Sequence, residues 1–404
     1  MLSTKNILLS SAIRNTTASS LLPAVANYAL LSSTSGITKR YKHHKTQSQF
    51  AATDSITPLE PLPNKPIIDM AYDLHLPERS VLGKLPYHCE EPIVFVHGLF
   101  GSKRNYFADC KKIANALQTP VYTVDVRNHG LSEHALPFDY ETITNDVLHF
   151  IEKHQLTGAS KNKKVSIIGY SLGAKVAMMS LLKKPETFRS AVIIDNSPVV
   201  QPEITPFLKI FVKACVSTLQ NGQIKANDKL WRHKASQAMR KLIPSPGIRG
   251  YLLNNVINKP PKTKEYKSPV INYNDGYIHF RNPVKHMSEI AVGNVADWPT
   301  KLVEGKQYLG PVCFLRGLKS DFILENGIKA INKYFPYNEI IGLNTTHFML
   351  NERPNEYVRS IVDFFKSSRS ALENKILADS KKGTVSIDIV SEGEQQLEGD
   401  KKEL

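Results

Sequence analysis

The segment Val165–Lys175 reads VSIIGYSLGAK and places a Gly-x-Ser-x-Gly pentapeptide between an apolar, β-branched run and a helical pattern. This context predicts a nucleophile elbow, in which a sharp strand-to-helix turn exposes the hydroxyl of Ser171 at the carboxyl edge of a sheet. Gly169 and Gly173 fit it, because side chains there would collide with the neighbouring strand or helix. The N–H of Leu172 would begin the helix and point at a developing oxyanion. A plain Gly/Ser turn is the alternative.

A loop further upstream has the composition of a second oxyanion element. Residues 92–102 read PIVFVHGLFGS, an apolar strand that ends in His-Gly-x-x-Gly. The glycines let the backbone approach a substrate carbonyl, so the N–H of Leu99 is the second expected donor. His97 is expected to hold the loop by hydrogen bonds, because a base must approach Ser171 from another loop and be oriented by a carboxylate.

Four motifs follow one another in a fixed order along the chain. After His-Gly-x-x-Gly come DVRNHGLS at 125–132, GYSLG at 169–173 and THFMLNERP at 346–354. Asp125 and Arg127 of the second motif are expected to form a structural ion pair. In this order the motifs resemble the α/β-hydrolase superfamily. Residues 193–199, IIDNSPV, and the N-terminus resemble the group of abhydrolase domain-containing protein 11 and the yeast mitochondrial ethanol acetyltransferases.

The resemblance implies an α/β fold with a mostly parallel central sheet, helices on both faces and a helical cap inserted after the sixth strand. The alternation of strand and helix patterns supports the parallel sheet. Residues 67–368 form the expected hydrolase domain, and amphipathic stretches within about 201–300 form the expected cap. Residues 46–66 are expected to be a linker, and residues 369–404 a disordered polar tail.

The general base is placed at His347. Of thirteen histidines, His347 follows a short apolar strand, residues 340–343, and precedes a helix that begins near Pro354. The family's catalytic histidine stands at this position. A neutral imidazole can take the serine proton and return it to a leaving group.

Two aspartates compete for the role of the acid that orients His347. Asp195 ends the strand formed by residues 191–194, and Asp321 follows the strand formed by residues 312–316. Both lie at carboxyl ends of strands, where the sites of open α/β sheets are found. The commoner pattern of the superfamily favours Asp321, whereas the resembled group places the acid in the Asp-x-x-Pro-Val turn. Asp195 is therefore preferred, and Asp321 stays open.

Composition is consistent with an enzyme of a reducing compartment. The four cysteines show no Cys-x-x-Cys spacing, so neither a disulfide framework nor a metal site is expected. The net charge is +15, but residues 1–53 hold six Lys and Arg and no acid, which leaves about +9 (15 − 6 = 9). Nucleic-acid binding is therefore not expected. No segment is long and apolar enough to predict a membrane span.

The first 45 residues are typical of a mitochondrial transit peptide, because they are basic, rich in Ser, Thr, Ala and Leu, and free of acids. A mitochondrial protein, most simply of the matrix, is expected.

The predicted function is serine-dependent acyl transfer. The resemblance implies an alcohol acetyltransferase that makes ethyl acetate from acetyl-CoA and ethanol, with esterase and thioesterase side activity on short-chain esters. Acetyl-CoA is then a co-substrate, and no bound cofactor is expected. A mitochondrial ester or lipid hydrolase is the first alternative, and a non-enzymatic matrix interaction protein on this fold is the second.

Overall fold

The computed structural model describes residues 60–78, 91–158, 163–262, 265–290 and 292–381. A seven-stranded sheet runs through them in the order β1-β3-β2-β4-β5-β8-β9. Only β1 is antiparallel to its neighbour, β3. The strands are β1 (Tyr72–His75), β2 (Ile93–Val96), β3 (Val121–Val124), β4 (Val165–Tyr170), β5 (Phe188–Ile194), β8 (Val312–Gly317) and β9 (Asn338–Leu343). This agrees with the predicted mostly parallel sheet.

The central strands are parallel because both of their faces are covered. Every residue of β2 and β4 is buried, as continuous Val and Ile runs predict for strands between two helical layers. The covering helices are α1 (Phe107–Leu117), α2 (Tyr140–Lys153), α3 (Leu172–Lys183), α9 (Glu325–Tyr334), α10 (Met349–Glu352) and α11 (Pro354–Lys381).

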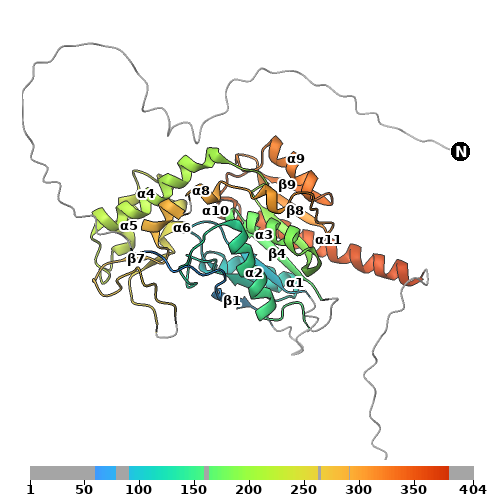
Figure 1. Ribbon diagram of the computed structural model, residues 1–404, viewed down its shortest axis with the longest axis horizontal. Coiled ribbons are helices and arrows are strands. Elements are labelled where there is room, and N and C mark those ends of the chain that lie inside the picture. Colours follow the sequence, from blue (N-terminus) through green and yellow to red (C-terminus); the bar gives the residue numbers. More distant parts are fainter. Residues whose placement is uncertain (1–59, 79–90, 159–162, 263–264, 291, 382–404) are drawn as a thin grey trace, which may run out of the picture. The chain divides into compact units, whose positions relative to one another are not determined.

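Right-handed crossovers assign these helices to the two faces. Helix α1 connects β2 to β3, which lies nearer the β1 end of the sheet. Helices α2, α3 and α9 each connect a strand to one that lies nearer the β9 end. Helices that cross in opposite directions lie on opposite faces. Accordingly α1 packs against α11, and α2 packs against α3 (Figure 1).

The cap is the segment that follows β5 and precedes β8 in the sequence, and it is drawn in yellow-green to orange in Figure 1. It contains α4 (Thr205–Gly222), α5 (Trp231–Met239), α6 (Pro246–Leu253), β6 (Val256–Ile257), β7 (His279–Phe280), α7 (Val284–Ile290) and α8 (Val292–Val295). Helix α4 packs against α5, α7 and α8. The cap begins after the fifth strand of the described residues, where the sequence predicts a sixth.

Two predicted boundaries differ from the structure. Residues 60–66 were assigned to a linker, yet Lys65 N–H donates to the carbonyl of Leu136 at 2.8 Å, and Leu136 N–H donates to the carbonyl of Pro63 at 2.8 Å. This stretch belongs to the domain, because backbone pairing outweighs its proline content. The disordered tail is expected to begin at residue 369, but α11 continues to Lys381. The predicted transit peptide and residues 382–404 lie outside the described residues.

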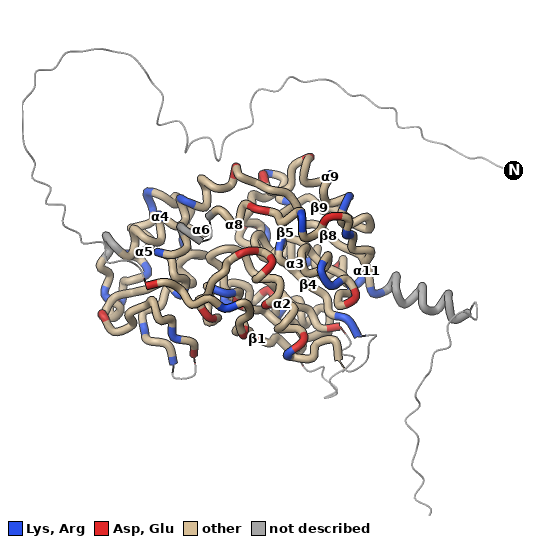
Figure 2. The backbone as a smooth tube through the Cα atoms, in the orientation of Figure 1, with Lys and Arg blue, Asp and Glu red and all other residues tan. Residues whose placement is uncertain are grey.

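Charges are spread over the domain. In Figure 2, Lys and Arg are interspersed with Asp and Glu along the described chain. Among the described residues, no helix is apolar and long enough for a bilayer, and no cluster of His, Cys, Asp and Glu could hold a metal ion.

Candidate active site

The elbow between β4 and α3 has the geometry that the pentapeptide predicts. Ser171 has φ 55° and ψ −113°, a backbone conformation that residues other than glycine rarely adopt. A Cβ at Gly169 would lie 2.2 Å from the carbonyl oxygen of Gly173, and a Cβ at Gly173 would lie 2.1 Å from that of Val96. Only glycine fits at either position, so the helix can start against the strand.

Ser171 and His347 meet at the carboxyl edge of the sheet. The Oγ of Ser171 lies 2.9 Å from Nε2 of His347, and Nδ1 of His347 lies 2.8 Å from Oδ2 of Asp195. The three groups form a continuous hydrogen-bonded relay that links hydroxyl, imidazole and carboxylate. His347 is 9% exposed and Asp195 fully buried.

Asp195 is held by the end of the neighbouring strand. Gly317 N–H donates to its Oδ1 at 2.8 Å, and the Ser320 hydroxyl donates to its Oδ2 at 2.5 Å. Asp321, the competing candidate, is exposed, and the ring nitrogens of His347 are bonded to Asp195 and Ser171 instead. The structure therefore brings Asp195, and not Asp321, to His347.

The imidazole of His347 is clamped by aromatic rings. Phe322 stacks on it with 3.7 Å between centroids and 11° between planes, and Tyr170 lies against it at 5.2 Å and 23°. The Tyr170 hydroxyl also donates to the carbonyl of His347 at 2.9 Å. Sequence reasoning missed Ser320 and Phe322. The parallel pairing of β5 with β8 is the signal that could have found them, because it brings the turn after β8 to Asp195.

Of the two predicted oxyanion donors, Leu172 directly follows Ser171 and Leu99 lies in the loop that lines its pocket. Leu172 is the first residue of α3, so its N–H has no acceptor within the helix. In the His-Gly-x-x-Gly loop, Phe100 N–H donates to Nε2 of His129 at 3.0 Å, and Gly101 N–H donates to the carbonyl of Gly98 at 2.9 Å. Leu99 precedes these two occupied donors, its own N–H has no acceptor within the described residues, and Leu99 lines the pocket over Ser171.

Buried histidines hold this loop, as expected for His97. Its Nδ1 lies 2.8 Å from the carbonyl of Gly98, and its Nε2 accepts Val126 N–H at 3.2 Å. Burial lowers the pKa of His97 to about 4 and that of His129 to about 3, so both rings are neutral at pH 7.

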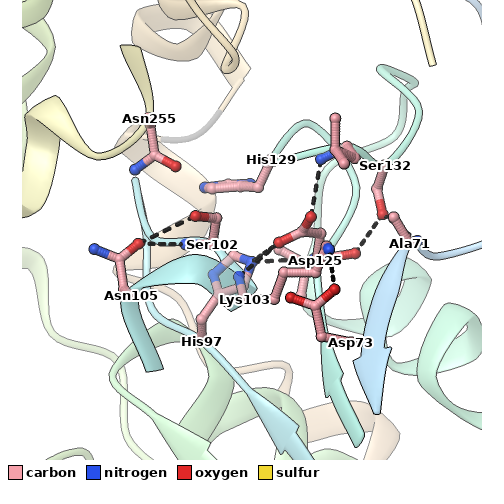
Figure 3. Close-up of polar contacts among 12 residues, drawn as sticks. Ala71, Asp73, His97, Ser102, Lys103, Asn105, Asp125, His129, Ser132 and Asn255 are labelled. Carbon is pink, nitrogen blue, oxygen red and sulfur yellow. Dashed lines mark hydrogen bonds and ion pairs between the residues drawn. The ribbon is translucent and has the colours of Figure 1, made fainter. Parts of the chain in front are cut away.

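The predicted ion pair between Asp125 and Arg127 does not form. Asp125 accepts the N–H of Lys103 at 2.7 Å (Figure 3). It also accepts the N–H of Leu131 at 2.9 Å and thereby ties two loops together. Burial raises the pKa of its carboxyl to about 6. Arg127 instead forms a buried pair with Asp146 at 2.6 Å. Asp125 and Arg127 would point to the same side if the strand continued through them. They lie beyond the end of β3, however, and the Arg127 side chain turns toward Asp146 of α2.

An apolar pocket lies directly over Ser171. Its volume is about 30 Å³. Aromatic and aliphatic side chains dominate its lining, which includes Leu99, Phe100, Ile204, Phe207, Leu208, Phe211, Val295, Phe322 and Phe348. A space that holds one water takes about 10–15 Å³ by this measure, so the pocket has room for a group of two or three heavy atoms.

The fold and the serine relay define an α/β hydrolase. Residues 91–245 match the family described as alpha/beta hydrolase fold. A solved marine microorganism esterase has the same fold, with a TM-score of 0.57 and 23% identity over 74% of this chain and 99% of that one.

Curated relatives narrow the assignment. The chain is 63% identical to ethanol acetyltransferase 1 of Hanseniaspora uvarum, over 77% of this chain and 90% of that protein. It is 60% identical to ethanol acetyltransferase 1 of Kluyveromyces lactis, over 78% and 84% of the two chains. The chain belongs to the ethanol acetyltransferase family of α/β-hydrolase-fold enzymes.

Proposed function

We propose that this protein transfers the acetyl group of acetyl-CoA to ethanol through an acetyl-Ser171 intermediate. The observation that carries the proposal is the relay of Ser171, His347 and Asp195 beneath a pocket of acetyl size. The names of the relatives supply the donor and the acceptor.

The first half-reaction forms the acetyl-enzyme. His347 Nε2 takes the Ser171 proton while Oγ attacks the thioester carbonyl, and the N–H groups of Leu99 and Leu172 receive the oxyanion. The C–S bond then breaks, and the protonated His347 gives its proton to the leaving thiolate. Asp195 keeps the imidazole in the required tautomer and stabilises its charged form.

The second half-reaction repeats these steps with an alcohol. His347 takes the ethanol proton, the ethoxy oxygen attacks the acetyl carbonyl, and Ser171 recovers its proton as ethyl acetate leaves. Water in place of ethanol gives acetate, so esterase and thioesterase side activity use the same intermediate. An apolar pocket lining favours ethanol, because it offers water few hydrogen-bond partners.

One assay separates the candidate functions. The purified protein is given acetyl-CoA with and without ethanol, and ethyl acetate, acetate and free CoA are quantified. Ethyl acetate as a major product supports the transferase. Acetate as the only product would support the ester hydrolase. The absence of turnover with any acetyl donor would support the non-enzymatic interaction protein.

We also propose that residues 1–45 carry the protein into mitochondria, most simply into the matrix. The acid-free, basic and Ser-rich composition of this segment supports the proposal. Fused to a fluorescent reporter, the segment should carry the reporter into mitochondria, and a reporter that stays in the cytosol would overturn this.

A further inference from the structure

A second cavity lies beside the apolar pocket. Its volume is about 340 Å³, within the range of small-molecule sites, and Tyr170 and Tyr251 line both spaces. The rest of its lining comes from the 3-10 helix Lys103–Tyr106, from α1, α5 and α10, and from α6 and its C-cap, and includes Asn105, Asp109, Arg232, Asn254 and Asn351. Ethanol has three heavy atoms and does not need this volume.

The two shared tyrosines differ in how they are held. Tyr170 ends β4, and its hydroxyl bonds to the carbonyl of His347. Tyr251 belongs to the cap helix α6, and its hydroxyl donates to the carbonyl of Leu99 at 3.3 Å. Its ring meets Phe348 edge-on at 6.5 Å. Tyr251, which comes from the cap, therefore lines both the apolar pocket and the second cavity.

The lining of the cavity suits an uncharged, amide-bearing chain. Asparagine side chains offer both donors and acceptors to amide groups. Asp109 accepts the Tyr357 hydroxyl at 2.5 Å, and burial raises the pKa of its carboxyl. A carboxyl group at this position disfavours a phosphate inside the cavity.

Arg232 supplies positive charge at the outer side. It is exposed, and its guanidinium donates only to neutral acceptors, the carbonyls of Gly250 and Leu253 and the side chain of Asn254. It forms no ion pair with an acidic residue in the described ranges. An unneutralised guanidinium fits a phosphate oxygen.

We propose that the polar cavity receives the pantetheine arm of the acyl thioester, with Tyr251 as the partition from the acyl pocket and Arg232 facing the phosphates. This rests on acetyl-CoA as the donor. The arm has two amides and one free hydroxyl group, which match the asparagine lining, and its thioester end then reaches Ser171 past Tyr251.

Filling the cavity provides the test. Gly250 lines it, and a Cβ there would meet no atom within 4 Å. Methionine also has a higher helix propensity than glycine, so Gly250→Met adds a side chain at a wall of the cavity where its Cβ meets no atom. Gly293→Met is the matched control, because Gly293 is an exposed helical glycine, also with no atom within 4 Å, that does not line the cavity. The substrates are acetyl-CoA and p-nitrophenyl acetate, which lacks the arm.

Gly250→Met should raise the KM for acetyl-CoA roughly tenfold or more and leave p-nitrophenyl acetate hydrolysis within about twofold of the parent. Gly293→Met should change neither. An unchanged KM for acetyl-CoA would overturn the proposal, and so would an equal loss with both substrates, which would mean a damaged Ser171 site.

A second variant separates the arm from its phosphates. Arg232→Gln should raise the KM for acetyl-CoA and leave that for S-acetylpantetheine unchanged; an equal effect on both donors contradicts the phosphate contact. If the parent protein hydrolyses p-nitrophenyl acetate but never turns over acetyl-CoA, the proposed donor itself is wrong.

Discussion

The sheet edge and the cap contribute to the site in different ways. Ser171, Asp195 and His347 each follow a strand, and hydrogen bonds from neighbouring strand ends fix them. Over Ser171 the cap contributes aromatic side chains, such as Phe211, which stacks on Phe348 with 3° between their planes. The edge therefore determines the chemistry, and the cap determines which acyl donor and acceptor reach it.

The cap also reaches the oxyanion loop directly. Tyr251 donates to the carbonyl of Leu99, and Asn255 donates to the carbonyl of Phe100. Lys175, one turn after Ser171, donates to the carbonyls of Val199 and Asp297, both at 2.9 Å. The two bonds of Lys175 therefore connect α3 to the chain on both sides of the cap. Mutations at the edge should therefore abolish all reactions, and mutations in the cap should redistribute them.

The largest effect is expected for the nucleophile. Ser171→Ala should lower both ethyl acetate formation and ester hydrolysis by roughly 10⁵–10⁶, because one acyl-enzyme feeds both outcomes. Product analysis with acetyl-CoA, with and without ethanol, measures this, and circular dichroism checks the fold. Either activity surviving above a few per cent would remove Ser171 from its role.

The acid comes next. Asp195→Asn should lower acyl transfer by about 10⁴, because an amide supports the wrong imidazole tautomer and cannot stabilise the imidazolium. Asp321→Asn is the matched control and should stay near the parent rate, since Asp321 is exposed. Single-turnover acetylation compares the two. A dead Asp321→Asn beside an active Asp195→Asn would contradict the geometry of the relay.

Sequence reasoning predicted the edge better than the cap. The elbow, the order of the motifs and His347 are local patterns, and β4 and β5, which carry Ser171 and Asp195, contain apolar runs rich in Val and Ile. The preference for Asp195 over Asp321 came from the resemblance, because two aspartates that both follow strands cannot be distinguished by local pattern. Only the pairing of β5 with β8 shows which one reaches His347.

Other features depend on contacts between distant residues and left no local signal. Arg127 pairs with Asp146, nineteen positions away, rather than with Asp125. The polar cavity joins residues from Asn105 to Asn351, so no window of sequence contains it. The sequence predicts amphipathic cap segments within about 201–300, but not which of their faces turn to Ser171.

A smaller effect is expected for a cap residue in the acyl pocket, whose mutation should change the acyl-chain preference. Leu208 of α4 lines the pocket and is buried. Leu208→Ala should shift the preference from acetyl toward butyryl donors by roughly 10–100-fold in relative kcat/KM, since each methylene accommodated is worth about 1–3 kcal/mol. Ester formation from a series of acyl-CoA chain lengths measures this. An unchanged profile would mean that Leu208 does not limit chain length.

The smallest effect concerns the stability of the edge in acid. Burial lowers the pKa of His97 to about 4, and those of His129 and His134 to about 3. Below pH 6.5 the unfolded chain therefore binds more protons than the folded one, so stability falls as pH drops through 6.5 toward 3–4. Each histidine should cost about 2 kcal/mol between pH 7 and pH 5. Asp125, with its raised pKa, opposes this loss below about pH 6.

His129→Gln tests that origin of the acid sensitivity. Glutamine keeps one donor and one acceptor for the carbonyl of Arg127 and the N–H of Phe100, but it does not titrate. The variant is expected to be less stable at pH 7 and to lose about 2 kcal/mol less than the parent between pH 7 and pH 5. Urea unfolding at both pH values measures the difference. His233→Gln, at an exposed position of α5, is the control and should keep the parent's pH dependence. If both variants lose as much stability as the parent, the loop histidines are not what makes the edge sensitive to acid, and the cap or the sheet must be unfolding first.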